Sequence, residues 1–346
     1  MAESRHLGAS PPSSAFRGPL FIVGMPRSGT KLLRGLLGGH SRVGIPDAET
    51  EFLPRWAATW DSLGDLSQHD AFSRFYAQVT RSAYFTFLLE EQGRRVTEQA
   101  WFDACRSFDV GGVFEALVRL DGAVPPDGVW GDKSPGYIAH LPLIWSLWPW
   151  ARVVHIVRDV RDYCLSMNSA WHKHMLRAAQ RWTDRVEQAR ADARARPPNY
   201  VEVRYEDLLA EPEPVLRRLC AFADLDYEPA MVRLSRATEN LGAAAGQVGI
   251  KRDNAGKYTT AMDPGVRARI ERVAGATLRS LGYPVSYGGP VRRVPATLML
   301  AWQLEDGVNL VRSDVALRGL SGAVRFRLRL FRETGTLERI VGQRRG

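Results

Sequence analysis

The order of apolar and polar positions near the N-terminus predicts a strand, a loop and a helix. Residues 20–23 (Leu-Phe-Ile-Val) are an apolar run without helical period, which is typical of a buried strand. Glycine, proline and small residues follow at 24–29, and leucines at 32, 33, 36 and 37 then predict a helix with one apolar face. This order brings backbone N–H groups and a helix N-terminus to one point, so the segment predicts a phosphate-binding loop.

The pairing of strand and helix repeats along the chain. Apolar runs predict strands at 152–158 and 200–204, and a turn-rich segment at 130–136 follows or ends a short strand. Helical periodicity predicts helices at 172–194, 205–223 and 266–281. Alternating strands and helices are typical of a parallel sheet with right-handed crossovers. We therefore expect a three-layer α/β/α fold with a central parallel sheet.

Other regions differ from this core, which we expect to span residues 19–287. Residues 1–18 are polar and rich in Ser, Pro and Gly, which predicts a disordered leader. Residues 54–130 carry many aromatic side chains at helical spacing, so we expect a helical insertion that supplies an acceptor pocket or lid. Residues 288–346 form a C-terminal extension. At 325–332 arginines alternate with apolar residues, which argues against a helix. A membrane-surface anchor, an edge strand and a partner contact are all open interpretations of this tail.

The composition adds basic charge and few cysteines to this picture. The 346 residues carry a formal net charge of +9, which favours anionic partners, although only five of the 47 basic residues are lysines and a GC-rich coding background produces the same bias. Nucleic acid is disfavoured, because the aromatic residues cluster at 52–130 instead of alternating with basic ones. The three cysteines match neither a zinc site nor a disulfide framework, and no run reaches 18 apolar residues. We expect a cytoplasmic protein without a transmembrane segment.

The phosphate loop differs from that of ATP- and GTP-hydrolysing enzymes. Their loop requires Gly-x4-Gly-Lys-Ser/Thr, in which the hydroxyl binds magnesium. Here the order is reversed to Thr30-Lys31, and Leu32 stands where the hydroxyl is needed. Asp159 follows an apolar strand as a magnesium-binding carboxylate would, but the adjacent Arg158 disfavours a metal there. A kinase for a nucleotide or small molecule is therefore the alternative interpretation.

Arg158 and Ser166 predict a second phosphate site. Arg158 ends a predicted strand, and Ser166 lies eight residues further on, about two turns into the next helix. Ligands of parallel α/β sheets bind at the carboxyl ends of the strands, where the loop at 24–29 also lies. We therefore expect a ligand that carries two separate phosphate groups.

Three motifs, in this order and spacing, resemble the sulfotransferase superfamily. They are Pro26-Arg-Ser-Gly-Thr30, Ile156-Val-Arg-Asp-Val-Arg-Asp162 and Arg204-Tyr-Glu-Asp-Leu208, and the resemblance covers about residues 19–287. It implies a fold similar to P-loop NTPases and an enzyme that uses 3′-phosphoadenosine 5′-phosphosulfate (PAPS) and releases 3′-phosphoadenosine 5′-phosphate (PAP). The implied acceptor is a hydroxyl or amine of a small molecule, lipid or glycan, and no metal is implied. A homo-oligomer is left open.

The resemblance also implies which residues bind the donor. Members of the family hold the 5′-phosphosulfate with the loop and the 3′-phosphate with the end of a strand and the helix after it. A later residue contacts the adenine nucleotide, and a basic loop closes over the 3′-phosphate. The matching positions are Arg27, Ser28, Gly29, Thr30 and Lys31 in the loop, Arg158 and Ser166 at the 3′-phosphate, Tyr205 at the adenine nucleotide, and Lys251, Arg252 and Lys257 in a basic loop at 249–258.

The catalytic base is implied to be a glutamate. The branch that acts on phenols and steroids places a catalytic histidine shortly after a lysine, but the segment after Lys133 has none. The chain is more similar to the tyrosylprotein and glycan branches, whose base is a glutamate after the first helix. Glu49 aligns best with that base, and Glu51 is the second candidate. Lys133 matches a lysine near the sulfuryl group, and Arg27 and Lys31 share the charge on the leaving phosphate in a proportion that the sequence leaves open.

Overall fold

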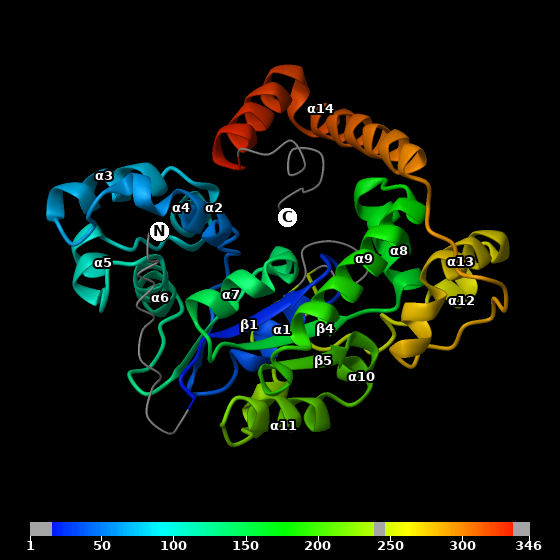
Figure 1. Ribbon diagram of the computed structural model, residues 1–346, viewed down its shortest axis with the longest axis horizontal. Helices are drawn as coiled ribbons and strands as arrows, with labels where there is room; N and C mark the ends of the chain where they lie inside the picture. Colours follow the sequence, from blue (N-terminus) through cyan, green and yellow to red (C-terminus); the bar gives the residue numbers. More distant parts are fainter. Residues whose placement is uncertain (1–15, 239–245, 335–346) are drawn as a thin grey trace, which may run out of the picture.

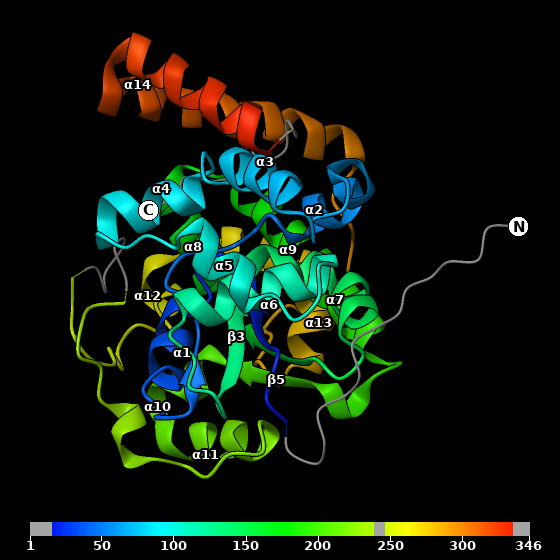
Figure 2. The same cartoon turned by 90° about the vertical axis from the view of Figure 1, so that its left-hand side faces the viewer.

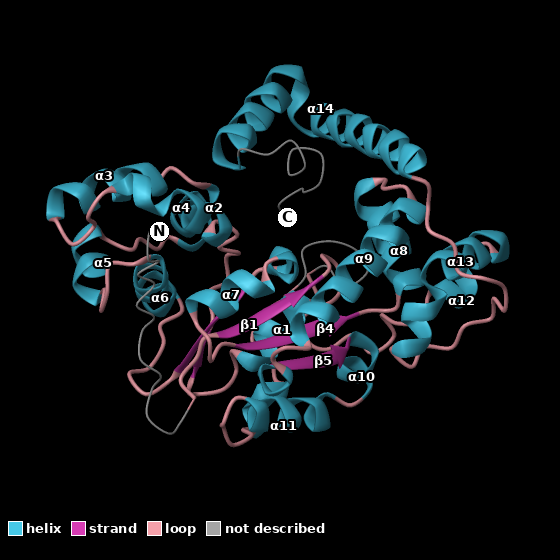
Figure 3. Cartoon of the chain, in the orientation of Figure 1, coloured by secondary structure: helices cyan, strands magenta, loops and turns pink. Residues whose placement is uncertain are grey.

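A parallel sheet forms the centre of the molecule. In the residues that the computed structural model describes, 16–238 and 246–334, five strands pair in the order β2-β3-β1-β4-β5, and each neighbouring pair is parallel. They are β1 (Leu20–Gly24), β2 (Val43–Gly44), β3 (Val129–Lys133), β4 (Arg152–Val157) and β5 (Tyr200–Arg204). Helices cover both faces of the sheet (Figure 3), which confirms the three-layer α/β/α fold.

Side chains of β1 alternate between the two faces of the sheet, as the pleat requires. Leu20 and Ile22 pack with the leucines of α1 (Thr30–Leu37) and with α10 (Tyr205–Ala210) and α11 (Pro212–Phe222). Phe21 and Val23 pack on the other face, in the core that continues into the aromatic insertion. Further along that face lie α7 (Leu141–Leu147), α8 (Val160–Trp171), α9 (Met175–Ala193) and α13 (Pro264–Ser280).

Residues 53–121 form a helical unit beside the sheet, coloured blue to cyan in Figure 1. Its buried side chains are mostly aromatic, and Trp101 and Phe114 are completely buried. Aromatic rings also connect the unit to the sheet. The ring centre of Trp148 lies 5.6 Å from that of Phe114 in the unit and 5.7 Å from that of Phe21 in β1. The elements are α2 (Leu53–Thr59), η1 (Trp60–Leu63), α3 (His69–Val79), α4 (Ala83–Gln92), α5 (Glu98–Ala104) and α6 (Val110–Asp121).

Short helices connect the remaining elements. These are η2 (Pro135–Ala139), η3 (Pro197–Asn199), η4 (Pro229–Val232) and α12 (Tyr258–Ala261). The single helix predicted at 205–223 was wrong, because the chain divides into α10 and α11 at Glu211. Pro212 has no N–H group to continue the first helix, but it is well suited to the first position of a new one.

The C-terminal extension contains α14 (Ala296–Thr334), which is interrupted at Gly319, where φ is 69°. The prediction that the alternating residues 325–332 avoid a helix was wrong, because they lie inside α14. Arg and Leu are good helix formers, and the strands of the described sheet offer these residues no pairing. No helix in the described residues is both long and apolar enough to cross a membrane. Most of the predicted leader, residues 1–15, lies outside the described residues.

Candidate active site

The loop between β1 and α1 has the backbone shape of an anion site. Arg27 and Gly29 adopt positive φ angles of 69° and 90°. A Cβ atom at Gly29 would lie 2.3 Å from the ring of Tyr205, so only glycine fits there. The hydroxyl of Ser28 is buried and has no partner among the described residues, and the N-cap residue of α1, Gly29, has no side chain to cap the first turn. These donors and the helix N-terminus suit a phosphate or sulfate group.

The Arg158 side chain joins this loop to the end of β4. Its Nη1 atom donates to the carbonyl oxygen of Arg27 at 3.1 Å, and its Nη2 atom donates to the carbonyl of Asn254 at 2.9 Å. The guanidinium lies 4.8 Å from the Tyr205 ring centre, and its buried Nε has no partner among the described residues. Arg27 in turn donates from Nε to Ser166 Oγ on α8 at 3.3 Å. Residues predicted to bind two phosphates are thus in direct contact.

Lysines of the loop at 249–258 lie close to Arg158. Asn254 donates to the hydroxyl of Tyr205 at 2.7 Å and accepts from Lys257 Nζ at 2.6 Å. Burial and the neighbouring cations Arg158 and Lys251 lower the pKa of Lys257. Like charges destabilise one another, so this group of cations favours the binding of an anion.

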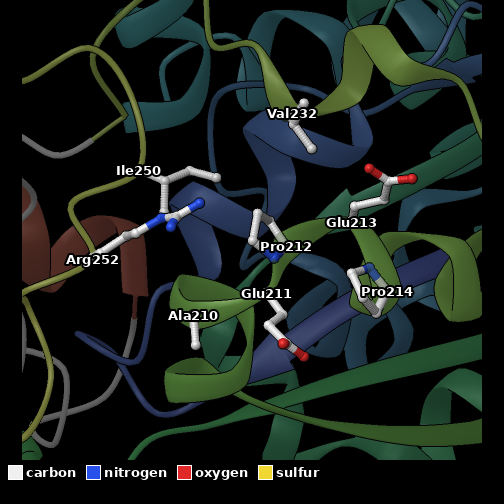
Figure 4. A pocket seen from close by; sticks show the side chains of 8 residues that line it. All are labelled: Ala210, Glu211, Pro212, Glu213, Pro214, Val232, Ile250 and Arg252. Atoms are coloured by element: carbon white, nitrogen blue, oxygen red, sulfur yellow. The ribbon is translucent and has the colours of Figure 1, made fainter.

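Arg252 belongs to the same loop but lies in a different environment. It lines a pocket with Val232, Ile250 and residues 210–214, and Figure 4 shows its guanidinium directed toward Ile250 and Pro212. Glu211 and Glu213 also line this pocket. Their carboxylates disfavour an anion in this pocket.

Glu49 and Lys133 form an ion pair at the same edge of the sheet. Lys133 is the last residue of β3 and pairs with Ile22 of β1, which places it beside the phosphate loop. Its Nζ atom lies 2.7 Å from Glu49 Oε1, with the lysine side chain 1% exposed and the glutamate 31% exposed. The next residue, Thr50, shares a 2.7 Å hydrogen bond with the hydroxyl of Tyr137 in η2. The turn that carries Glu49 is therefore fixed to the segment that follows β3.

Glu51 is placed differently from Glu49. It is 5% exposed and adopts a positive φ of 44°. Its backbone N–H points to Ser134 Oγ at 3.4 Å, so the residue belongs to the buried contact between this turn and η2. Glu49 is the more accessible of the two carboxylates to an acceptor.

Two acidic residues at this edge were not among the predicted site residues. Asp132 precedes Lys133 and is completely buried, and this burial raises its pKa to about 7. Asp47 contacts Arg34 of α1, Arg236 and Gln92. Although burial acts to raise the pKa of Asp47, Arg236 and Arg34 hold it below its usual value. Asp132 could have been found from the sequence, because it is a charged residue in a predicted short strand. Asp47 could not, because its partners are distant in the sequence and meet it only in the folded protein.

Comparison with known proteins identifies the family. The model described as "Sulfotransferase family" matches residues 19–229. The chain belongs to the sulfotransferase family. This confirms the resemblance in the three motifs, and the chain is an enzyme that transfers sulfuryl groups. A Caenorhabditis briggsae protein with protein-tyrosine sulfotransferase in its name is 25% identical over 232 residues, which are 63% of this sulfotransferase and 70% of the relative.

Two solved structures are similar in fold to this sulfotransferase. The sulfotransferase domain from the curacin biosynthetic pathway is 21% identical, with a TM-score of 0.52 over 79% of this chain and 100% of that one. The sulfotransferase domain of the Synechococcus PCC 7002 olefin synthase is 20% identical, with a TM-score of 0.53 over 79% and 98%. In the part of the chain that the structure describes, no three His, Cys, Asp or Glu residues form a metal-binding group.

Proposed function

We propose that this sulfotransferase moves a sulfuryl group from PAPS to a hydroxyl or amine acceptor, with Glu49 as the base. The observation that carries the proposal is the contact between the phosphate loop and the cations around Arg158. A nucleotide with a single phosphate chain needs one anion site, whereas PAPS carries a 5′-phosphosulfate and a separate 3′-phosphate. The buried Ser28 hydroxyl and the N-terminus of α1 suit the former, and Arg158, Lys251 and Lys257 suit the latter.

The residues at the sheet edge have the roles that sulfuryl transfer requires. PAPS supplies an activated sulfuryl group on a phosphate that can leave. Glu49 takes the proton of the acceptor as the acceptor oxygen or nitrogen forms its bond to sulfur. The bond between sulfur and the bridging oxygen breaks, and its electron pair stays with the phosphate, whose charge Arg27 and Lys31 neutralise. Lys133, paired with Glu49 at 2.7 Å, orients the carboxylate and places a cation beside the reacting group.

The acceptor is proposed to be a small molecule, lipid or glycan that reaches Glu49 past the helical unit 53–121. Rings of that unit favour an apolar or ring-bearing acceptor over a long acidic glycan. Cys105, Cys164 and Cys220 are free thiols. They support the proposal of a cytoplasmic enzyme.

The donor proposal is tested by comparing PAP with AMP, which lacks the 3′-phosphate. We expect PAP to raise the melting temperature clearly more than AMP at equal concentration, because charge-assisted hydrogen bonds contribute about 1.5–3 kcal/mol each. Arg158→Gln should remove most of this difference, while Arg185→Gln on α9 should retain it. Equal shifts for PAP and AMP in the wild-type protein would contradict the two-phosphate interpretation.

A further inference from the structure

Helix α14 buries acidic residues on the face that packs against the body of the protein. Asp306, Leu310 and Asp314, spaced by four residues, are each 1% exposed. Asp306 accepts hydrogen bonds from Arg177 of α9 at 2.6 Å and from the backbone N–H of His174 at 2.8 Å. Asp314 pairs with Arg327. Asp306 therefore joins α14 to α9, and Asp314 joins the two parts of α14 on either side of Gly319.

A different face of α14 carries an apolar stripe. Leu300 is 60% exposed, Leu304 65%, Val308 49% and Val311 47%. Spacings of four, four and three residues place these side chains in one row, which we call the outer stripe. Beyond the interruption at Gly319, Leu320 and Val324 continue the exposure at 72% and 50%. Scattered apolar residues are normal on a surface, but a continuous row of this kind marks a site of contact.

The exposed charges on α14 are mainly positive. Arg312 and Arg325 are exposed, whereas Asp306 and Asp314 are buried in ion pairs. Among the described side chains of this helix, Glu305 is the one exposed carboxylate. An apolar row with arginines beside it is typical of helices that lie in the plane of an anionic membrane surface.

We propose that α14 lies on an anionic lipid surface, with the outer stripe among the acyl chains and Arg312 and Arg325 at the headgroups. Figure 2 shows α14 as the outermost layer of the molecule, above α3 and far from the sheet, where a flat surface can reach it. A second copy of the chain fits less well, because stable protein interfaces involve about 20–30 residues on each side. An interfacial helix needs only one apolar face, buried to about 5–10 Å.

The proposal is tested by sedimentation with vesicles of phosphatidylcholine and phosphatidylglycerol in a ratio of about 3:1. We expect the wild-type protein to bind these vesicles more strongly than vesicles of phosphatidylcholine alone, and less strongly as salt is raised. Leu300→Gln/Leu304→Gln should weaken binding at least about tenfold, because two exposed leucines no longer enter the acyl region. Arg312→Gln/Arg325→Gln should weaken it several-fold and reduce its dependence on salt.

Leu298→Gln is the matched control on the same helix. Leu298 is 44% exposed but lies two positions before Leu300, about 200° around the helix from it, so its side chain is outside the outer stripe. We expect this variant to bind vesicles like the wild-type protein, and all variants to keep the PAP-induced melting shift. Equal binding to both kinds of vesicle, or an equal loss in Leu298→Gln, would overturn the proposal. So would a wild-type dimer in light scattering that Leu300→Gln/Leu304→Gln converts to a monomer, because a second copy would then cover the stripe.

Discussion

The edge of the sheet around the phosphate loop and the helical unit 53–121 have opposite kinds of interior. At the edge, the buried side chains are polar or charged: Ser28, Asp132, Lys133 and Arg158 are at most 6% exposed. In the helical unit the fully buried side chains are rings, such as Phe72, Trp101 and Phe114. Burial of rings stabilises a fold, whereas burial of polar groups destabilises it unless each finds a partner. The edge therefore suits an anionic ligand, and the fully buried rings of the helical unit stabilise the fold.

Glu49→Gln is the largest expected change, and it should affect turnover alone. Removal of a general base typically lowers a rate by about 10²–10⁴-fold, while the amide keeps the size of the carboxylate. We expect transfer of labelled sulfate from PAPS, measured with the best acceptor from a panel of phenols, sugars, lipids and peptides, to fall by this factor. The PAP-induced melting shift should stay unchanged, because Glu49 pairs with Lys133 at the end of β3, whereas Arg158 follows β4.

Glu51→Gln is the control for that assignment. Glu51 is buried, so its substitution should lower stability more than it lowers the rate of the folded enzyme. A variant Glu49→Gln with full turnover, together with an inactive but folded Glu51→Gln, would move the base to Glu51.

Trp101→Ala tests the other half of the comparison and should affect stability alone. The ring is fully buried, and its centre lies 6.1 Å from that of Trp56 and 5.5 Å from that of Phe75. Its Nε1 atom donates a hydrogen bond to the carbonyl of Val113 at 2.9 Å. Loss of a buried tryptophan typically costs about 3–5 kcal/mol of unfolding free energy. Urea unfolding measures this loss, and PAP affinity of the folded variant should match the wild-type value.

Trp60→Ala provides the comparison within the same unit. Trp60 packs on Phe75 at 6.0 Å but is only partly buried, so its loss should cost clearly less than that of Trp101. If Trp101→Ala weakened PAP binding in the folded protein, the separation between a stabilising unit and a binding edge would be wrong.

The two regions also differ in how much of them could be predicted. The strand, loop and helix at 20–37 are adjacent in sequence, so their phosphate site followed from local pattern. The pair of Glu49 and Lys133 joins residues 84 positions apart, and the resemblance named both residues without predicting their contact. Pairing of β2 with β3 brings the segment that carries Glu49 beside Lys133.

Two further features could not be predicted from the sequence: the direction in which a side chain points, and whether an alternating segment has a neighbouring strand to pair with. Lys257 and Arg252 stand in one loop with the same charge, yet one approaches Asn254 and Arg158 while the other lines a pocket with two glutamates. Alternation at 325–332 favoured a strand, but a strand needs a partner edge, and an isolated segment rich in Arg and Leu forms a helix instead.

Asp132→Asn examines a buried group where the two regions meet, since β3 also packs against α6. Burial raises the pKa of Asp132 from 3.8 to about 7. The unfolded chain loses this proton near pH 4, and the folded protein keeps it until about pH 7. The folded state therefore binds one more proton between these values, and the stability of the wild-type protein falls as pH rises through this window.

Asparagine has nearly the same shape and stays neutral, so Asp132→Asn should escape this fall. The unfolding free energy of both proteins is measured by urea titration at a series of pH values. We expect the difference, variant minus wild type, to increase by up to about 4 kcal/mol from pH 4 to pH 7, at 1.36 kcal/mol per pKa unit. Above pH 7 the difference should stay constant, because both states of the wild-type protein are then ionised. A difference that is independent of pH would mean that the Asp132 carboxylate is already ionised in the folded state, stabilised by Lys133, and that the edge buries its charge at little cost.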